Sequence, residues 1–217
     1  MKRIRPWLLL IIFTVTVVAI PPRRHKSSER SPGEFDYYVL SLSWAPSFCA
    51  SHSGDASPEC KTGNHTTFVL HGLWPQAQSG PPPMECAPAR PVAKSIVDSM
   101  VRFYPGRDLV QHEWEKHGTC SNLSSAEYFN RVEQAFTSVK VPSQFSSLNR
   151  DRQFDVKQIE QSFAAANNAP TNSFRISCHA GEMVGVEACL SKDIKHQACS
   201  ASVRECPTGQ VLLRAPR

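Results

Sequence analysis

The sequence lacks the features that mark repeat, fibrous and membrane-spanning proteins. It contains no internal repeat, no long low-complexity segment and no coiled-coil pattern. Its longest predominantly apolar run, residues 7–20, is 14 residues long, whereas a helix that crosses a bilayer needs about 20. We therefore expect no stable membrane insertion. A chain of 217 residues suits one domain of ordinary size, and we expect a monomer.

The apolar run follows a basic start, which is typical of a secretory signal peptide. The stretch AIPPRRHKSS after it offers no small-x-small cleavage site and places three cations directly behind the run, so an uncleaved membrane anchor is the alternative. We expect residues 1–30 to be a signal peptide with a flexible lead-in and residues 31–217 to form a single domain. The protein is then expected to be secreted or periplasmic.

Residues 31–217 lack the positive charge that the whole chain carries. The formal net charge is +5, but residues 1–30 hold seven Lys or Arg and one acid and so contribute +6, which leaves −1 for the remainder. A basic field over the whole domain is therefore excluded as the means of holding a polyanion. Such a ligand would need a local cluster of cations.

No two cysteines lie two to four residues apart, the spacing that zinc ribbons use. An even number of cysteines behind a signal sequence is typical of disulfides formed in an oxidising compartment, so four bridges are expected. Counting does not fix the pairing, because eight cysteines allow on the order of 100 connectivities. The eight are Cys49, Cys60, Cys86, Cys120, Cys178, Cys189, Cys199 and Cys206.

Residue patterns predict strands at both ends of the chain and helices between them, which indicates an α+β fold. A strand over 66–71 is predicted to end in a turn at Gly72 and Pro75. Ser124 stands three residues before Glu127, as in a capping box. Other strands are predicted at 35–46, 173–178, 182–190 and 210–214, and helices at 92–103, 112–118, 122–139 and 155–166.

The stretch HEWEKHGTC, residues 112–120, concentrates titratable side chains. On a helix, four of them share an arc of roughly 140°: His112, Glu113, Lys116 and His117. Trp114 points away from this arc and is expected to pack into the body of the protein. A solvated helical face with an i,i+4 pair is an equally good explanation of the pattern taken alone.

Two catalytic explanations compete with the solvated face. HEWEKH resembles the zinc motif H-E-x-x-H, but its histidines are five residues apart, which rotates them away from a common metal. Metal-free cleavage of RNA instead needs a base for the 2′-hydroxyl proton, an acid for the leaving 5′-oxygen and positive charge near the phosphorane. Two imidazoles, a carboxylate and a lysine supply these groups.

The acid and the base of such a reaction must lie on opposite sides of the phosphorus, so one helical face does not provide both. His71, at the end of the apolar segment in FVLHGLWPQ (residues 68–76), is the candidate partner. Trp74 follows three residues later, where an indole can stack on a nucleobase. Ordinary core packing is the alternative for both side chains.

Together, FVLHGLWPQ and HEWEKHGTC resemble the two active-site segments of the ribonuclease T2 family of acid endoribonucleases. The resemblance covers most of residues 35–206, and YVLSLSWAPSFC is more similar to bacterial members than to plant or fungal ones. It implies that residues 31–217 form a catalytic domain with a central antiparallel β-sheet and several helices packed against it. It also implies cleavage of single-stranded RNA through a 2′,3′-cyclic phosphate, without metal or cofactor.

Carried onto matching positions, the resemblance implies a role for each residue of the two motifs. His117 would be the general base and His71 the general acid, Glu113 and Lys116 would stabilise the phosphorane, and His112 would hold the phosphate. A non-catalytic RNA-binding or storage protein on the same fold is the alternative. The presence of all five side chains favours an enzyme.

The resemblance further implies that Trp74 stacks on one base. In plant members a glutamine contacts a base at the position of Ser43, so the second base site is undefined and low base specificity is expected. The implied disulfides are Cys49–Cys60, Cys86–Cys120 and a nested pair, Cys178–Cys206 around Cys189–Cys199.

Overall fold

The structure is a computed structural model in which residues 30–64, 66–203, 205–207 and 209–217 are described. The signal peptide and lead-in predicted for residues 1–30 lie outside these residues, apart from Arg30 at the boundary. Across the described ranges, no helix is both long and apolar enough to cross a membrane.

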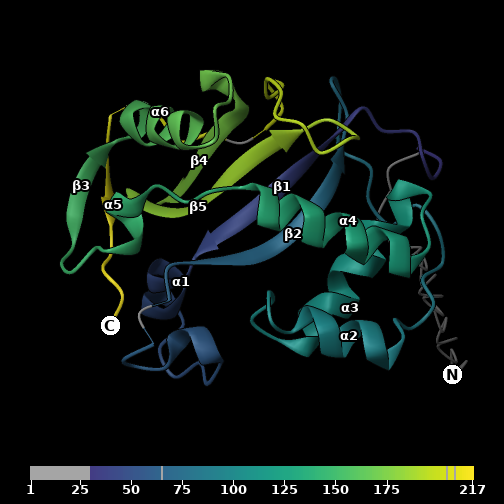
Figure 1. Cartoon of the computed structure of the whole chain (residues 1–217), viewed down its shortest axis with the longest axis horizontal. Helices are drawn as coiled ribbons and strands as arrows, with labels where there is room; N and C mark the ends of the chain where they lie inside the picture. Colours follow the sequence, from purple (N-terminus) through teal and green to yellow (C-terminus); the bar gives the residue numbers. More distant parts are fainter. Residues whose placement is uncertain (1–29, 65, 204, 208) are drawn as a thin grey trace, which may run out of the picture.

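In the described part of the chain, six strands form one sheet (Figure 1). Five of them follow the order β2-β1-β5-β6-β3, and β4 lies outside this order and pairs with β5. The pairs are antiparallel except for one parallel step between Glu182 of β5 and Leu212 of β6. The predicted α+β fold with a central antiparallel sheet is confirmed. The strands are β1 (Tyr37–Trp44), β2 (Phe68–Gln76), β3 (Arg152–Asp155), β4 (Phe174–His179), β5 (Glu182–Leu190) and β6 (Gln210–Leu213).

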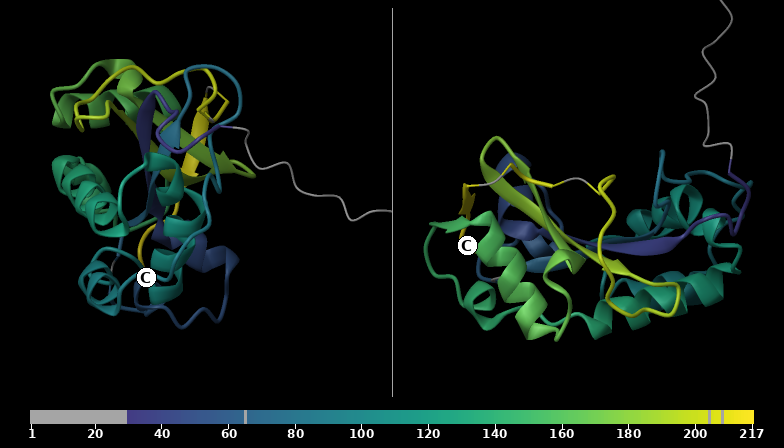
Figure 2. Two further views of the ribbon diagram at one scale, coloured as in Figure 1. Left: turned by 90° about the vertical axis from the view of Figure 1, so that its right-hand side faces the viewer. Right: turned by 90° about the horizontal axis from the view of Figure 1, so that it is seen from above.

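Helices cover one face of this sheet. Figure 2 shows α4 and α6 on the same side of the strands, and α2 and α3 lie beyond the edge formed by β2. The helices are α1 (Ala45–Ser51), α2 (Lys94–Met100), α3 (Arg107–Lys116), α4 (Ser125–Ser138), α5 (Ser143–Ser146) and α6 (Val156–Ala166). Three short 3-10 turns are η1 (Pro58–Cys60), η2 (Gly118–Ser121) and η3 (Thr171–Ser173).

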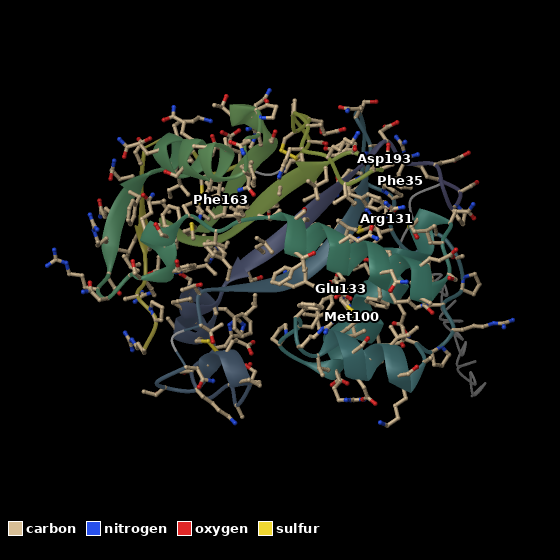
Figure 3. All side chains as sticks on the ribbon, viewed as in Figure 1. Phe35, Met100, Arg131, Glu133, Phe163 and Asp193 are labelled. Atoms are coloured by element: carbon tan, nitrogen blue, oxygen red, sulfur yellow. A yellow bond between two sulfur atoms is a disulfide. The ribbon has the colours of Figure 1, made fainter. Side chains whose placement is uncertain are left out.

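The alternation of β1 determines which face of the sheet is covered. Leu40, Leu42 and Trp44 are at most 2% exposed and pack into the main core beneath the helices. In Figure 3, Phe163 lies near α6 and Met100 near α2, toward opposite ends of this core. Ser41 and Ser43 alternate with Leu40, Leu42 and Trp44 along β1 and face the other side of the sheet. Helices α4 and α6 do not reach this side, which we call the open face.

Most predicted elements are present, and two elements near the candidate site have boundaries that differ from the prediction. Strand β2 does not turn at Gly72 and Pro75 but continues to Gln76; Pro75 is tolerated because β2 is an edge strand and needs no further hydrogen bond there. Helix α3 begins at Arg107, five residues before the predicted start at 112, and ends at Lys116, two residues before the predicted end. The capping box of Ser124 and Glu127 is confirmed.

Other differences concern short elements. The predicted helix over 92–103 is shorter, at Lys94–Met100. Strand β3 and helices α1 and α5 were not predicted, because each is short or carries no clear apolar period.

Four disulfides join all eight cysteines in the predicted pairs: Cys49–Cys60, Cys86–Cys120, Cys178–Cys206 and Cys189–Cys199. The second of these bonds ties the loop after β2 to η2, which directly follows α3. The end of the second motif is therefore linked covalently to the loop that follows the first motif.

Candidate active site

A β-bulge places His71 on the open face of the sheet. Ser41 of β1 pairs with Gly72 and Leu42 pairs with Leu70, so His71 is the extra residue between them. Leu70 remains in the core at 0% exposure, whereas the His71 side chain is 43% exposed. A bulge re-aims a side chain in this way, and here it turns an imidazole out of an otherwise apolar strand. Nδ1 of His71 lies 3.3 Å from Oγ of Ser43.

Glu113 occupies a notch on β2 that exists because residue 72 is glycine. Its Oε2 accepts a 2.8 Å hydrogen bond from Nε1 of Trp74, and its Oε1 lies 3.7 Å from Nε2 of His71. A Cβ atom at position 72 would lie only 1.9 Å from Oε2 of Glu113. Gly72 therefore permits the close approach of α3 to β2 that joins the two sequence motifs.

His117 stacks on the indole of Trp74, with ring centroids 5.1 Å apart and an interplanar angle of 29°. The His71 ring meets the same indole edge-on, at 5.3 Å. His117 follows the last residue of α3 and has non-helical backbone angles (φ −122°, ψ −45°). The end of the helix thus turns His117 toward Trp74, which a regular helix would not do.

The expectation that four side chains share one outward face of α3 is wrong. Glu113 is 1% exposed and points against β2. His117 is 8% exposed and follows the last residue of the helix. These two side chains are therefore buried and do not face the solvent. His112 is exposed and Lys116 is half-buried. Trp114 packs against the core, 5.8 Å from the ring of Tyr128, as expected.

Burial and neighbouring cations shift the pKa values of three of these side chains. Burial raises the pKa of Glu113 to about 7, although the Trp74 hydrogen bond and Lys116 favour its charged form. Burial, reinforced by Lys116 and the other two histidines of the motifs, lowers the pKa of His117 to about 3. Burial, followed by His112 and Lys116, also lowers the pKa of His71. His112 and Lys116 therefore act on both imidazoles through their positive charge.

Two hollows meet on the open face of the sheet, and Trp74 and Glu187 line both. The smaller has a volume of about 290 Å³ and includes Lys116 and His117 in its wall. The larger, of about 480 Å³, includes His71 and Ser43. Both approach or reach the size of small-molecule sites. The two imidazoles thus line adjoining hollows.

The described residues contain no group of three or more His, Cys, Asp or Glu side chains arranged to hold a metal ion. The chemistry available at this site is instead that of two imidazoles, one buried carboxyl group and one ammonium group. Such a set transfers protons and stabilises negative charge.

Residues 35–205 match the Ribonuclease T2 family. The chain belongs to the ribonuclease T2 family. The T2 segment includes both motifs and all the site residues described above.

Similar proteins agree with the T2 assignment. A ribonuclease of Aeromonas hydrophila is 46% identical over 96 residues, or 44% of this chain and 42% of that protein. A probable ribonuclease of Haemophilus influenzae is 36% identical over 147 residues, or 61% and 53%. The chain spans about half the length of these curated relatives. The solved structure of an RNase-related protein from Calystegia sepium, at 22% identity and a TM-score of 0.67, covers 84% of this chain and 98% of its own and shows a common fold.

Two residues of the candidate site were not identified as site residues from the sequence. Gly72 stands inside a predicted motif, but only the position of Glu113 reveals why a side chain is not tolerated there. Glu187 lies on β5, directly opposite Ser41 of β1, and reaches the floor of both hollows. Its signal was an acidic residue within an apolar strand, which predicts a functional or paired carboxylate but not its location.

Proposed function

We propose that this protein is an endoribonuclease that cleaves single-stranded RNA by acid–base catalysis, through a 2′,3′-cyclic phosphate and without metal or cofactor. One observation carries the proposal: both imidazoles contact the ring of Trp74, so their centroids lie within about 10 Å of each other and border adjoining hollows. A phosphodiester at the junction of the hollows would have one imidazole on each flank.

The environments of the two imidazoles favour different roles. His117 stays neutral through the mildly acidic range because its pKa is about 3, which suits a base for the 2′-hydroxyl proton. His71 is more exposed and has the Glu113 carboxyl 3.7 Å away, which suits an acid. The 2′-oxygen attacks phosphorus, the bond to the 5′-oxygen breaks, and His71 protonates that oxygen as it leaves.

The remaining site residues stabilise the charge that develops. Lys116 and Glu113 would stabilise the phosphorane, and His112, at the exposed surface of α3, would hold a phosphate oxygen. The nucleoside with the attacking hydroxyl would lie in the smaller hollow beside His117, stacked against Trp74. The leaving nucleoside would lie beside His71 and Ser43 in the larger hollow. Ser43 lines the larger hollow at the position where plant members of the family have a base-contacting glutamine, and this replacement favours low base specificity.

We further propose that the protein acts as a secreted or periplasmic monomer. The four disulfides support an oxidising compartment.

The proposed reaction predicts its products. The purified protein is expected to cut a short single-stranded RNA into fragments with 2′,3′-cyclic phosphate ends and to leave the DNA of the same sequence intact, because DNA lacks the attacking hydroxyl. Mass spectrometry of the products measures both outcomes. Cleavage should persist in EDTA; loss of activity in EDTA would support the metal-dependent alternative, and cutting of DNA would contradict the mechanism.

The pKa shifts predict an acidic pH optimum for kcat/KM. Raising the pH removes the proton that His71 must donate, and because its pKa is lowered, activity should decline before about pH 6.5, the ordinary histidine value. Lowering the pH inactivates the base only as His117 is protonated, near pH 3. Initial rates measured from pH 3 to 8 at constant ionic strength test this profile. An optimum above pH 7 would contradict it.

A further inference from the structure

The larger hollow extends well beyond His71, along the open face of the sheet to helix α1 and to the hairpin between β4 and β5. Its far end is lined by Phe48 and His52 on the side of α1 and by His179 and Val184 on the side of the hairpin. Resting on the proposed function, we propose that this far end, the distal subsite, binds the second nucleotide on the 3′ side of the cleaved linkage.

One wall of the distal subsite is an aromatic pair held in a fixed orientation. The rings of Phe48 and His52 are stacked, with centroids 4.3 Å apart and an angle of 22°. Nδ1 of His52 lies 2.9 Å from the carbonyl oxygen of Phe48, and since a carbonyl only accepts, this nitrogen donates. The disulfide from Cys49 to Cys60 anchors the same helix. Aromatic rings fixed beside a groove provide a platform on which any nucleobase stacks.

A second β-bulge forms the opposite wall. Ser177 of β4 pairs with Gly185 and Cys178 pairs with Met183, so Val184 is the extra residue on β5. Its side chain is 37% exposed and lines the hollow, whereas Met183 stays in the core. The bulge on β2 exposes His71 in the same manner. The two bulges therefore place His71 and Val184 in the lining of the same hollow. Val184 adds an apolar surface to the hollow that the aromatic pair also lines.

A buried hydroxyl on the α1 side of the distal subsite supports a polar ligand. Ser47 is 4% exposed and lines the hollow, and its Oγ has no hydrogen-bond partner in the part of the chain that the structure describes. Leaving a buried hydroxyl unbonded is unfavourable. A ribose hydroxyl or a phosphate oxygen is suited to this position.

The chain direction follows from the catalytic roles. If His71 protonates the leaving 5′-oxygen, the departing strand lies on the His71 side of the cleaved linkage. The larger hollow continues from His71 toward α1. The 5′ part of the RNA lies instead in the smaller hollow beside His117. The distal subsite is therefore assigned to the downstream strand, and not to the upstream strand.

Three short substrates with one ribonucleotide test this assignment: rU-p-dA, the 3′-extended rU-p-dA-p-dA and the 5′-extended dA-p-rU-p-dA. Each has a single cleavable linkage, so kcat/KM compares the extensions directly. We expect the 3′ extension to raise kcat/KM about tenfold, the order of magnitude of one stacked base. The 5′ extension should have little effect. Equal rates for the first two substrates, or a larger gain from the 5′ extension, would overturn the assignment.

Variants test whether the increase in kcat/KM from the 3′ extension arises at the distal subsite. Phe48→Ala should abolish the advantage of the 3′-extended substrate and leave rU-p-dA cleavage unchanged, while Phe48→Tyr should keep the advantage. Val184→Glu should also remove it, because a carboxylate repels the downstream phosphate. Val101→Glu is the matched control: Val101 has the same exposed fraction, 37%, and lies after α2. Equal effects of the two glutamates would contradict the subsite.

The proposed function and the distal subsite fail in different ways. If the unmodified protein cleaves none of the three substrates, the proposed function is overturned and the subsite with it. If it cleaves all three with the same kcat/KM, or if Phe48→Ala keeps the full 3′ advantage, only the distal subsite is overturned.

Discussion

Replacing His117 or His71 by alanine is expected to lower kcat for RNA cleavage by about 10³-fold, within the range of roughly 10²–10⁴ that one general acid or base contributes. His117→Ala removes the base that remains neutral in acid, and His71→Ala removes the acid on the leaving oxygen. Because the base and the acid act as a unit in the same reaction, the double variant should be little slower than either single variant. Single-turnover rates on a short RNA measure these losses.

A third histidine provides the matched control. His196 is half-buried, and burial lowers its pKa as it does for the proposed catalytic pair, but it packs against Phe174, at 5.2 Å, outside the two hollows. His196→Ala should keep nearly full activity. If His117→Ala retained activity comparable to His196→Ala while folding normally by circular dichroism, the assignment of His117 as the base would be wrong.

The pH dependence of the single variants separates the two roles. In the unmodified protein the alkaline limb of the profile belongs to His71 and the acid limb to His117. Residual activity of His71→Ala should therefore lose the alkaline limb, and that of His117→Ala should lose the acid limb. The opposite assignment of limbs would exchange acid and base, and it would reverse the chain direction proposed for the distal subsite.

The sequence predicted the chemical groups of the candidate site better than their arrangement. Both motifs were identified from residue types and from their resemblance to the T2 family, and the structure brings His71, Trp74, Glu113 and His117 together. The helical period, however, placed Glu113 on an outward face with His117. A period describes only residues that remain in the helix, and α3 ends before His117.

The fold shows the same division. Strands with a clear alternation, such as β1 and β5, and helices with a capping box or an apolar stripe were predicted close to their observed bounds. The two bulges were not predicted, because a bulge depends on the register with a neighbouring strand. Each bulge places a side chain, His71 or Val184, on the open face, so the shape of the hollows could not follow from single-strand patterns.

Gly72→Ala is expected to destabilise the protein by about 1–3 kcal/mol, the usual cost of forcing an extra methyl group into a packed site. The new Cβ atom would lie 1.9 Å from Oε2 of Glu113 and 2.6 Å from Nε1 of Trp74. Because neither β2 nor α3 can retreat without breaking its own packing, the Glu113 side chain must move and the 2.8 Å bond to Trp74 is lost. Urea unfolding measures the change in stability, and kcat/KM should fall with it.

A double-mutant cycle shows whether Glu113 is the cause. In the Glu113→Ala background the carboxyl group is absent, so adding Gly72→Ala should cost clearly less than it does in the unmodified protein, with the remainder due to Trp74. Gly106→Ser is the control, since a Cβ at position 106 meets no atom within 4 Å and serine is a good residue before a helix. Equal costs of Gly72→Ala in both backgrounds would show that the glycine is needed for the strand itself. A smaller cost without Glu113 would mean that the absence of a side chain at Gly72 allows α3 to place the Glu113 carboxyl group between Trp74 and His71.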